Sequence, residues 1–124
     1  MKDGKYVILC IDDDQDVLDA LRIFLESKNY IMAGALSAEE GLKVYKEINP
    51  DLVIVDLMME SVDAGKNLVK ELQILNNKAP IYMLSAVGDT LAMNVNFTEL
   101  GLSGVFQKPI DFNSLLVTLK TKLK

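Results

Sequence analysis

The sequence predicts an α/β fold in which a parallel five-stranded sheet is covered by helices on both faces, a three-layer sandwich. Apolar runs alternate five times with polar or amphipathic segments along the 124 residues. The strand candidates are continuously apolar, as expected for parallel strands that are buried on both faces. Right-handed crossovers restrict such a chain to a doubly wound sheet, for which we expect the strand order 2-1-3-4-5.

The first half of the chain supplies two strands and two helices. Tyr6 to Ile11 is a continuous apolar run, and from Gln15 to Lys28 the apolar residues recur at helical spacing. Tyr30 to Leu36 is the second, shorter strand candidate. Ser37 then predicts a helix N-cap, with a glutamate three residues later to complete a capping box, and Pro50 ends this helix.

The second half repeats the alternation. Leu52 to Val55 and Ile81 to Leu84 are strand candidates that flank a helix of about a dozen residues. Thr90 to Leu100 is expected to be helical from its position, although its apolar residues alternate at period two. Val105 and Phe106 form a last short strand, and Asp111 caps the final helix. The side chains expected to point inward from the two well-patterned helices are Leu68, Val69, Leu72 and Leu75, then Phe112, Leu115, Leu116, Leu119 and Leu123.

Composition and charge exclude several classes of function. The formal net charge of −5 and the pI near 4.6 argue against direct nucleic-acid binding, which needs a basic surface. The chain has no histidine, so histidine catalysis and histidine metal ligands are excluded. Cys10 is the only cysteine and lies in an apolar run, which favours a buried thiol over a reactive one.

Length and hydropathy favour a single domain over residues 1–124, with nothing left for an output domain. No apolar stretch approaches the ~20 residues of a membrane span, and no basic run would hold the chain on an anionic membrane. We therefore expect a cytoplasmic protein without a membrane partner.

Polar side chains end four of the five predicted strands. Asp12 and Asp13 follow the first strand, Asp56 the third, Ser85 the fourth and Lys108 the fifth. Ligands of open parallel sheets bind beyond the carboxyl ends of the strands, so we expect these side chains to share one crevice. Taken singly, each has an ordinary structural role, such as helix capping by the aspartates or a turn at Lys108; the set in this order is what points to function.

The residue types in this set suit phosphoryl transfer. Clustered carboxylates need a cation, and oxygen ligands with a few waters favour Mg²⁺. Phosphoryl transfer needs in-line positioning and charge neutralisation, which the metal and Lys108 would supply from two sides. Asp56 would then be the nucleophile, Ser85 would donate a hydrogen bond to a phosphoryl oxygen, and the product would be an acyl phosphate.

Four segments closely resemble the receiver domains of response regulators in two-component systems, the CheY-like family: VILCIDDDQDVLDAL, PDLVIVDLMM, PIYMLSA and GVFQKPID. The resemblance covers nearly the whole chain and implies a flavodoxin-like (βα)₅ fold. It implies a sensor histidine kinase or a histidine phosphotransfer protein as phosphodonor, and a downstream protein partner or a missing output domain as target. Carried over by position, the resemblance implies that the metal is bound by Asp12, Asp13, Asp56 and the Met58 carbonyl, with Asp13 the more direct ligand of the acidic pair. It also implies that Asp56 is the phosphoacceptor, that Ser85 is the switch hydroxyl and that Lys108 binds the phosphoryl group.

Several positions depart from the family pattern. Val105 stands where the family has a tyrosine or phenylalanine that swings between states, so aromatic swinging cannot be the switch here. Phe106 is adjacent, but its side chain should point to the opposite face of the sheet. Glu60 replaces a frequent proline, and a glycine expected near position 64 is displaced to Gly65.

Three alternatives remain open at this stage. A pseudo-receiver would keep the fold as an interaction module that no longer signals by phosphorylation. An enzyme of the haloacid dehalogenase type would need a second aspartate where this chain has Met58, so we expect no turnover of an external substrate. A flavodoxin would need a first loop rich in serine, threonine and glycine, whereas the loop here is DDDQD.

Overall fold

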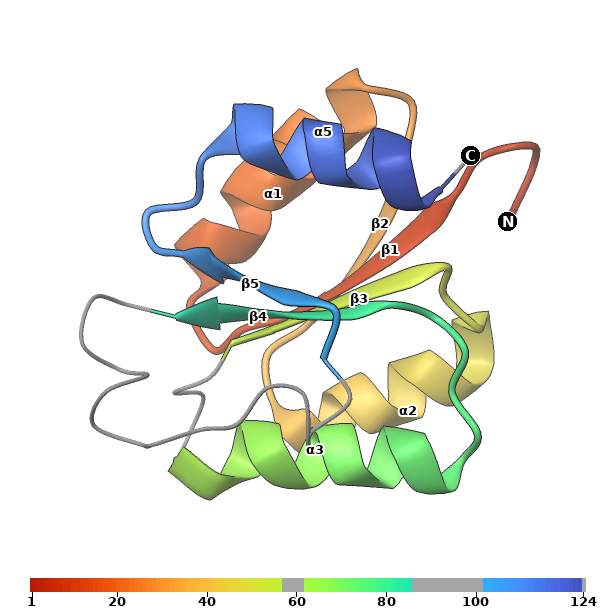
Figure 1. Ribbon diagram of the computed structural model, residues 1–124, viewed down its shortest axis with the longest axis vertical. Coiled ribbons are helices and arrows are strands. Elements are labelled where there is room, and N and C mark those ends of the chain that lie inside the picture. The colour runs from red at the N-terminus through yellow and green to blue at the C-terminus, as the bar shows by residue number, and fades with distance from the viewer. Residues whose placement is uncertain (57–61, 86–101, 124) are drawn as a thin grey trace.

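The structure, a computed structural model, describes residues 1–56, 62–85 and 102–123, and places five parallel strands in one sheet between two layers of helices (Figure 1). The strand order is β2-β1-β3-β4-β5, so the predicted fold class and topology are confirmed. The strands are β1 (Val7–Ile11), β2 (Ile31–Ala35), β3 (Leu52–Asp56), β4 (Ile81–Ser85) and β5 (Gly104–Gln107). The helices are α1 (Gln15–Ser27), α2 (Ala38–Ile48), α3 (Val62–Ile74) and α5 (Phe112–Lys122). The helix expected over Thr90 to Leu100 lies outside the described residues.

The helix boundaries follow the capping residues identified in the sequence. The Ser37 side chain accepts a hydrogen bond from the Glu40 backbone N–H at 3.1 Å and begins α2. Asn49, in the left-handed conformation at φ 48°, ends the same helix directly before Pro50. The Asp111 carboxylate accepts hydrogen bonds from the first N–H groups of α5, which confirms its predicted role.

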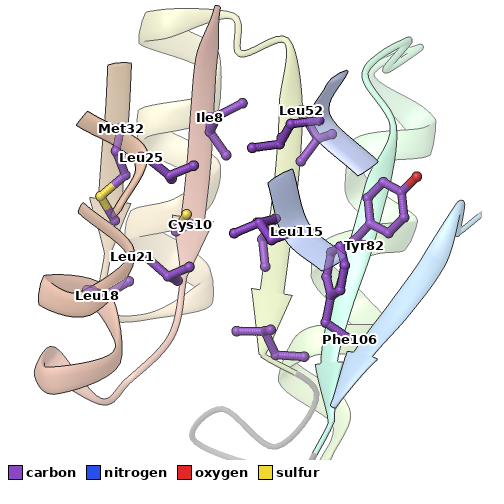
Figure 2. Close-up of a cluster of buried hydrophobic side chains, with 13 residues drawn as sticks. Ile8, Cys10, Leu18, Leu21, Leu25, Met32, Leu52, Tyr82, Phe106 and Leu115 are labelled. Carbon is purple, nitrogen blue, oxygen red and sulfur yellow. The ribbon is translucent and has the colours of Figure 1, made fainter. Parts of the chain in front are cut away.

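Each face of the sheet carries its own apolar core. The first core lies between the sheet and the helices α1 and α5 (Figure 2), and the second lies under α2 and α3. The central strands β1, β3 and β4 are buried along their whole length, as their continuous apolar runs predict. Cys10 belongs to the first core, where burial raises the pKa of its thiol to about 12, so the interpretation as a core thiol is confirmed.

Residues on β5 alternate between the two faces. Phe106 belongs to the first core and stacks on Tyr82 of β4 with ring centroids 5.2 Å apart. Val105 is half-buried and pairs in register with Met83, which belongs to the second core. The prediction that Phe106 points away from the face of Val105 is therefore confirmed.

Leu75 is a correction to the predicted core. We expected it to point inward from the third helix, but α3 ends at Ile74 and the Leu75 side chain is 44% exposed. Asn76 adopts the left-handed conformation, and the Asn77 N–H donates back to the Leu72 carbonyl, which closes the helix before Leu75 can complete the inward face. The other predicted positions, Leu68, Val69 and Leu72, are buried.

Arg22 extends from α1 to the outer edge of β2. Its Nη1 donates to the Met32 carbonyl at 3.0 Å. The Ile31 N–H donates to the Tyr6 carbonyl, so Ile31 faces β1, and the alternation of the strand turns the Met32 carbonyl away from the sheet. The guanidinium therefore satisfies an acceptor on the free edge of β2.

Gly41 brings α2 unusually close to β1. A Cβ atom at this position would lie 2.6 Å from Cδ1 and 2.9 Å from Cγ1 of Ile11. Both residues are buried, and Ile11 belongs to the second core. A glycine inside this helix is therefore explained by close packing against the strand.

Replacing Gly41 by alanine is expected to destabilise the fold by up to about 2 kcal/mol. The gain in helix propensity, about 1 kcal/mol, is outweighed by overpacking, which costs typically about 1–3 kcal/mol in a filled core. The matched variant Ile11→Val removes Cδ1, so it should cost less free energy in the Gly41→Ala background than in the wild type. Urea unfolding of the wild type, the two single variants and the double variant measures the free energy of unfolding of each. A Gly41→Ala chain more stable than wild type would contradict the packing argument.

Candidate functional site

Four segments deliver polar side chains to one point at the carboxyl edge of the sheet. Asp12 directly follows β1, and Asp56 and Ser85 are the last residues of β3 and β4. Lys108 follows β5, and its backbone N–H donates to the Ser85 carbonyl at 2.9 Å. The sheet register, which pairs Asp56 with Leu84, keeps these strand ends level. The sequence prediction that these residues share one crevice agrees with this placement.

Three carboxylates form a cluster at this edge. One oxygen each from Asp12, Asp13 and Asp56 lies within 4.8 Å of the others. Asp12 is fully buried and Asp56 is 4% exposed, whereas Asp13 is exposed to solvent. The cluster therefore combines two buried carboxylates, those of Asp12 and Asp56, with the solvent-exposed carboxylate of Asp13.

Lys108 joins the two buried carboxylates. Its Nζ lies 3.0 Å from Oδ2 of Asp12 and 3.2 Å from Oδ1 of Asp56. Burial by itself lowers the pKa of Lys108, but hydrogen bonds and charge attraction to both aspartates outweigh it and raise the pKa above its ordinary value. The ammonium is therefore charged at neutral pH and is held beside Asp56.

The loop after β1 divides the consecutive aspartates between two roles. Asp14 is the N-cap of α1, and its carboxylate accepts from the Asp16 N–H at 2.9 Å. Oδ1 of Asp12 accepts from the Asp14 N–H at 2.9 Å, which fixes the start of the loop. Helix capping thus accounts for Asp14 and leaves the roles of Asp12 and Asp13 to be explained otherwise.

The charges of the cluster fit a divalent cation. Three carboxylates and one ammonium make up this group, so its negative formal charges outnumber its positive one. The buried Oδ2 of Asp12 has no hydrogen-bond partner in the described part of the chain apart from its ion pair with Lys108. Hard oxygen ligands of this kind, partly open to water, suit Mg²⁺.

Of the other predicted site residues, the structure describes Ser85 but not Met58. The Ser85 residue is 2% exposed at the end of β4, next in sequence to Leu84, which pairs with Asp56. The Met58 carbonyl and Glu60 lie outside the described residues, so their predicted roles stay predictions.

An apolar cavity of about 290 Å³ beside Lys108 was not foreseen from the sequence. It lies where the N-terminal part of α1 meets the segment between β5 and α5. Its walls come from segments far apart in the chain, which local sequence patterns do not bring together. The lining residues are Asp16, Val17, Ala20, Leu84, Lys108, Pro109, Ile110 and Phe112.

Comparison with known proteins gives one consistent family. Residues 8–120 match the sequence model of the response regulator receiver domain. The transcriptional regulatory protein GlrR of Escherichia coli (strain K12) is 33% identical over 117 residues, which are 94% of this chain and 26% of that protein. The transcriptional regulatory protein ResD of Bacillus subtilis (strain 168) is 34% identical over 118 residues, which are 94% of this chain and 48% of that protein. This chain therefore spans between a quarter and a half of the length of these two relatives.

The fold comparison agrees. The chemotaxis response regulator CheY4 of Vibrio cholerae superposes with a TM-score of 0.84 at 24% identity, over 97% of this chain and 100% of that one. At this identity the likeness concerns the fold alone. Among residues 1–56, 62–85 and 102–123, no helix combines the length and the apolar character needed to cross a membrane.

Proposed function

Because this chain belongs to the response regulator receiver domain family of two-component signalling systems, we propose that Asp56 accepts a phosphoryl group in a reaction that depends on Mg²⁺. The observation that carries the proposal is the position of the Lys108 ammonium, 3.2 Å from Asp56 and 3.0 Å from Asp12, beside a carboxylate cluster with excess negative charge. The ligands for Mg²⁺ would be Asp12, Asp13, Asp56 and the Met58 carbonyl.

In the proposed reaction, an Oδ of Asp56 attacks the phosphorus atom of a phosphohistidine. The phosphorus–nitrogen bond of the donor breaks, the imidazole nitrogen leaves with the bonding electron pair and takes up a proton, and an acyl phosphate forms on Asp56. Mg²⁺, when bound by the carboxylate cluster, would supply positive charge to neutralise the phosphoryl oxygens. Lys108 holds a positive charge beside the acceptor, and Ser85 donates a hydrogen bond to the transferred group.

The composition of the chain and the cavity beside Lys108 indicate which partners the proposed reaction would need. The phosphodonor would be a sensor histidine kinase or a histidine phosphotransfer protein, because this chain has no histidine of its own. The apolar cavity beside Lys108 would receive an apolar side chain of that donor. The target of the signal would be a downstream protein or a further domain in the cytoplasm, and the acidic chain would not contact nucleic acid directly. External substrate would not be turned over.

Labelling of the purified chain with acetyl phosphate tests the proposal. We expect one phosphoryl group per chain, detected by intact mass, when Mg²⁺ is present, and none when EDTA replaces it. The label should be lost in mild base, as an acyl phosphate is. A chain that stays unlabelled at high Mg²⁺ would be a pseudo-receiver, an alternative for which the valine at position 105 is the structural argument.

A further inference from the structure

Asp14, the N-cap of α1, is hydrogen-bonded both to its own helix and to the acidic site. It lies in the short connection, residues 12–14, that leads from β1 into α1 at the carboxyl edge of the sheet (Figure 1). Its carboxylate accepts from the Asp16 N–H at 2.9 Å, and its carbonyl accepts from the Leu18 N–H at 3.2 Å. Its backbone N–H donates to Oδ1 of Asp12 at 2.9 Å. One residue thus connects the first turn of a helix to a buried carboxylate of the cluster.

Each oxygen of the Asp12 carboxylate has its own partner. Oδ1 accepts from the Asp14 N–H, and Oδ2 lies 3.0 Å from Nζ of Lys108. The Asp12 backbone N–H donates to the carbonyl of Ala35, the last residue of β2, at 3.0 Å. Because Asp12 is fully buried, water does not replace these partners. The orientation of this carboxylate therefore depends on where the first turn of α1 holds residue 14.

The backbone of Asp13 is fixed on both sides. The hydrogen bond from Asp12 to Ala35 holds the preceding residue, and the cap at Asp14 holds the following one. Asp13 is the exposed member of the cluster, with a carboxylate oxygen within 4.8 Å of those of Asp12 and Asp56. If the cap were lost, the peptide unit after Asp13 would gain freedom, and its carboxylate would no longer be held at this distance from the other two.

We propose that Asp14 is a positioning residue of the acidic site, which orients Asp12 and Asp13 for a divalent cation by capping α1. This inference rests on the Mg²⁺ site of the proposed function. Asp14 lies outside the cluster of three carboxylates, so its effect passes through its backbone N–H to Asp12. Residues that orient a metal ligand typically contribute about 10–100-fold to metal affinity. Because the capping oxygen carries the effect, a neutral side chain that caps equally well should replace Asp14.

Three substitutions of Asp14 separate capping from charge in an NMR titration with Mg²⁺ alone. Asp14→Asn removes the charge and keeps a preferred capping side chain, whereas Asp14→Ala removes both. Asp14→Glu keeps the charge, but glutamate is not among the residues preferred at an N-cap. The dissociation constant of Mg²⁺ should rise at least about tenfold in Asp14→Ala and Asp14→Glu. In Asp14→Asn it should stay within about threefold of wild type, because a charge outside the cluster is screened by solvent.

Asp111→Ala is the matched control. It also removes an aspartate that caps a helix, since the Asp111 carboxylate accepts from the Asn113 N–H at 2.9 Å, but that helix is α5 and Asp111 lies outside the cluster. Its melting temperature should fall as that of Asp14→Ala does, while its affinity for Mg²⁺ should equal that of wild type. Hydrogen exchange in EDTA adds a readout without metal. The amide of residue 14 should exchange at least about tenfold faster in Asp14→Ala than in Asp14→Asn, because its hydrogen bond to Asp12 is loosened.

Wild-type affinity for Mg²⁺ in Asp14→Ala overturns the positioning role, as does an Asp14→Asn chain that binds as weakly as Asp14→Ala, since charge would then be the cause. Equal weakening in Asp111→Ala overturns it too, because the effect would follow from lost stability. If Asp14→Ala does not fold, the comparison of Asp14→Glu with Asp14→Asn decides. A wild type that neither binds Mg²⁺ nor takes up label refutes both proposals, whereas a wild type that does both beside an unaffected Asp14→Ala refutes the positioning role alone.

Discussion

Replacing Asp56 by asparagine is expected to reduce labelling by acetyl phosphate to background. The amide oxygen of asparagine is neutral and cannot attack phosphorus as a carboxylate does. The fold should persist, because Lys108 keeps its ion pair with Asp12 at 3.0 Å and one of three mutually repelling carboxylates is removed. Intact mass after incubation with Mg²⁺ and acetyl phosphate measures the label, and thermal unfolding by circular dichroism checks the fold.

The matched control for this variant is Asp19→Asn. Asp19 is an exposed aspartate on α1 that accepts a hydrogen bond from the Gln15 amide, and it lies outside the carboxylate cluster. The control removes the same charge from the chain, so it should label as wild type does. Label that remains on Asp56→Asn would identify another acceptor and would refute the assignment.

Replacing Asp13 by asparagine is expected to abolish labelling that depends on Mg²⁺ while leaving the acceptor intact. Asp13 is the exposed member of the cluster, and its loss leaves Asp12, already ion-paired with Lys108, and Asp56 as carboxylate ligands. Mg²⁺ keeps several waters and few protein ligands, so wild-type affinity should be weak, roughly millimolar, and one lost carboxylate should bring it below the measurable range.

Two measurements separate this effect from damage to the fold. Calorimetric titration with Mg²⁺ should show binding to wild type and none to Asp13→Asn. Thermal unfolding in EDTA should show the variant at least as stable as wild type, because the metal-free cluster loses one repelling charge. Labelling of Asp13→Asn at the wild-type rate would show that this carboxylate is not a metal ligand.

The layout of the sheet could be predicted from sequence because the apolar runs and the capping residues are local features, and both kinds indicate the same element boundaries. Continuous apolar runs identify β1, β3 and β4, and Ser37 and Asp111 give two helix starts. Leu75 could not be placed, since the end of α3 depends on a left-handed Asn76 and a backbone hydrogen bond to Leu72, which helical periodicity does not encode.

The site could be predicted as a set of residues but not as a geometry. Strand ends place Asp56 and Lys108 at the same edge of a parallel sheet, and sequence suffices for that. Sequence did not indicate that Lys108 would also pair with the fully buried Asp12, nor which of the three consecutive aspartates would cap α1. Both outcomes depend on how the loop after β1 is held by side chain to backbone hydrogen bonds.

The contact between Arg22 and the Met32 carbonyl opposes aggregation of the chain at high protein concentration. The outer edge of β2 offers backbone groups that a foreign strand could pair with, and pairing at such edges is a common start of aggregation. An incoming strand would first have to displace a guanidinium that already donates to that edge at 3.0 Å, and would bring its own backbone against a positive charge. A helix residue with no part in the proposed chemistry thereby helps to keep the sheet at five strands.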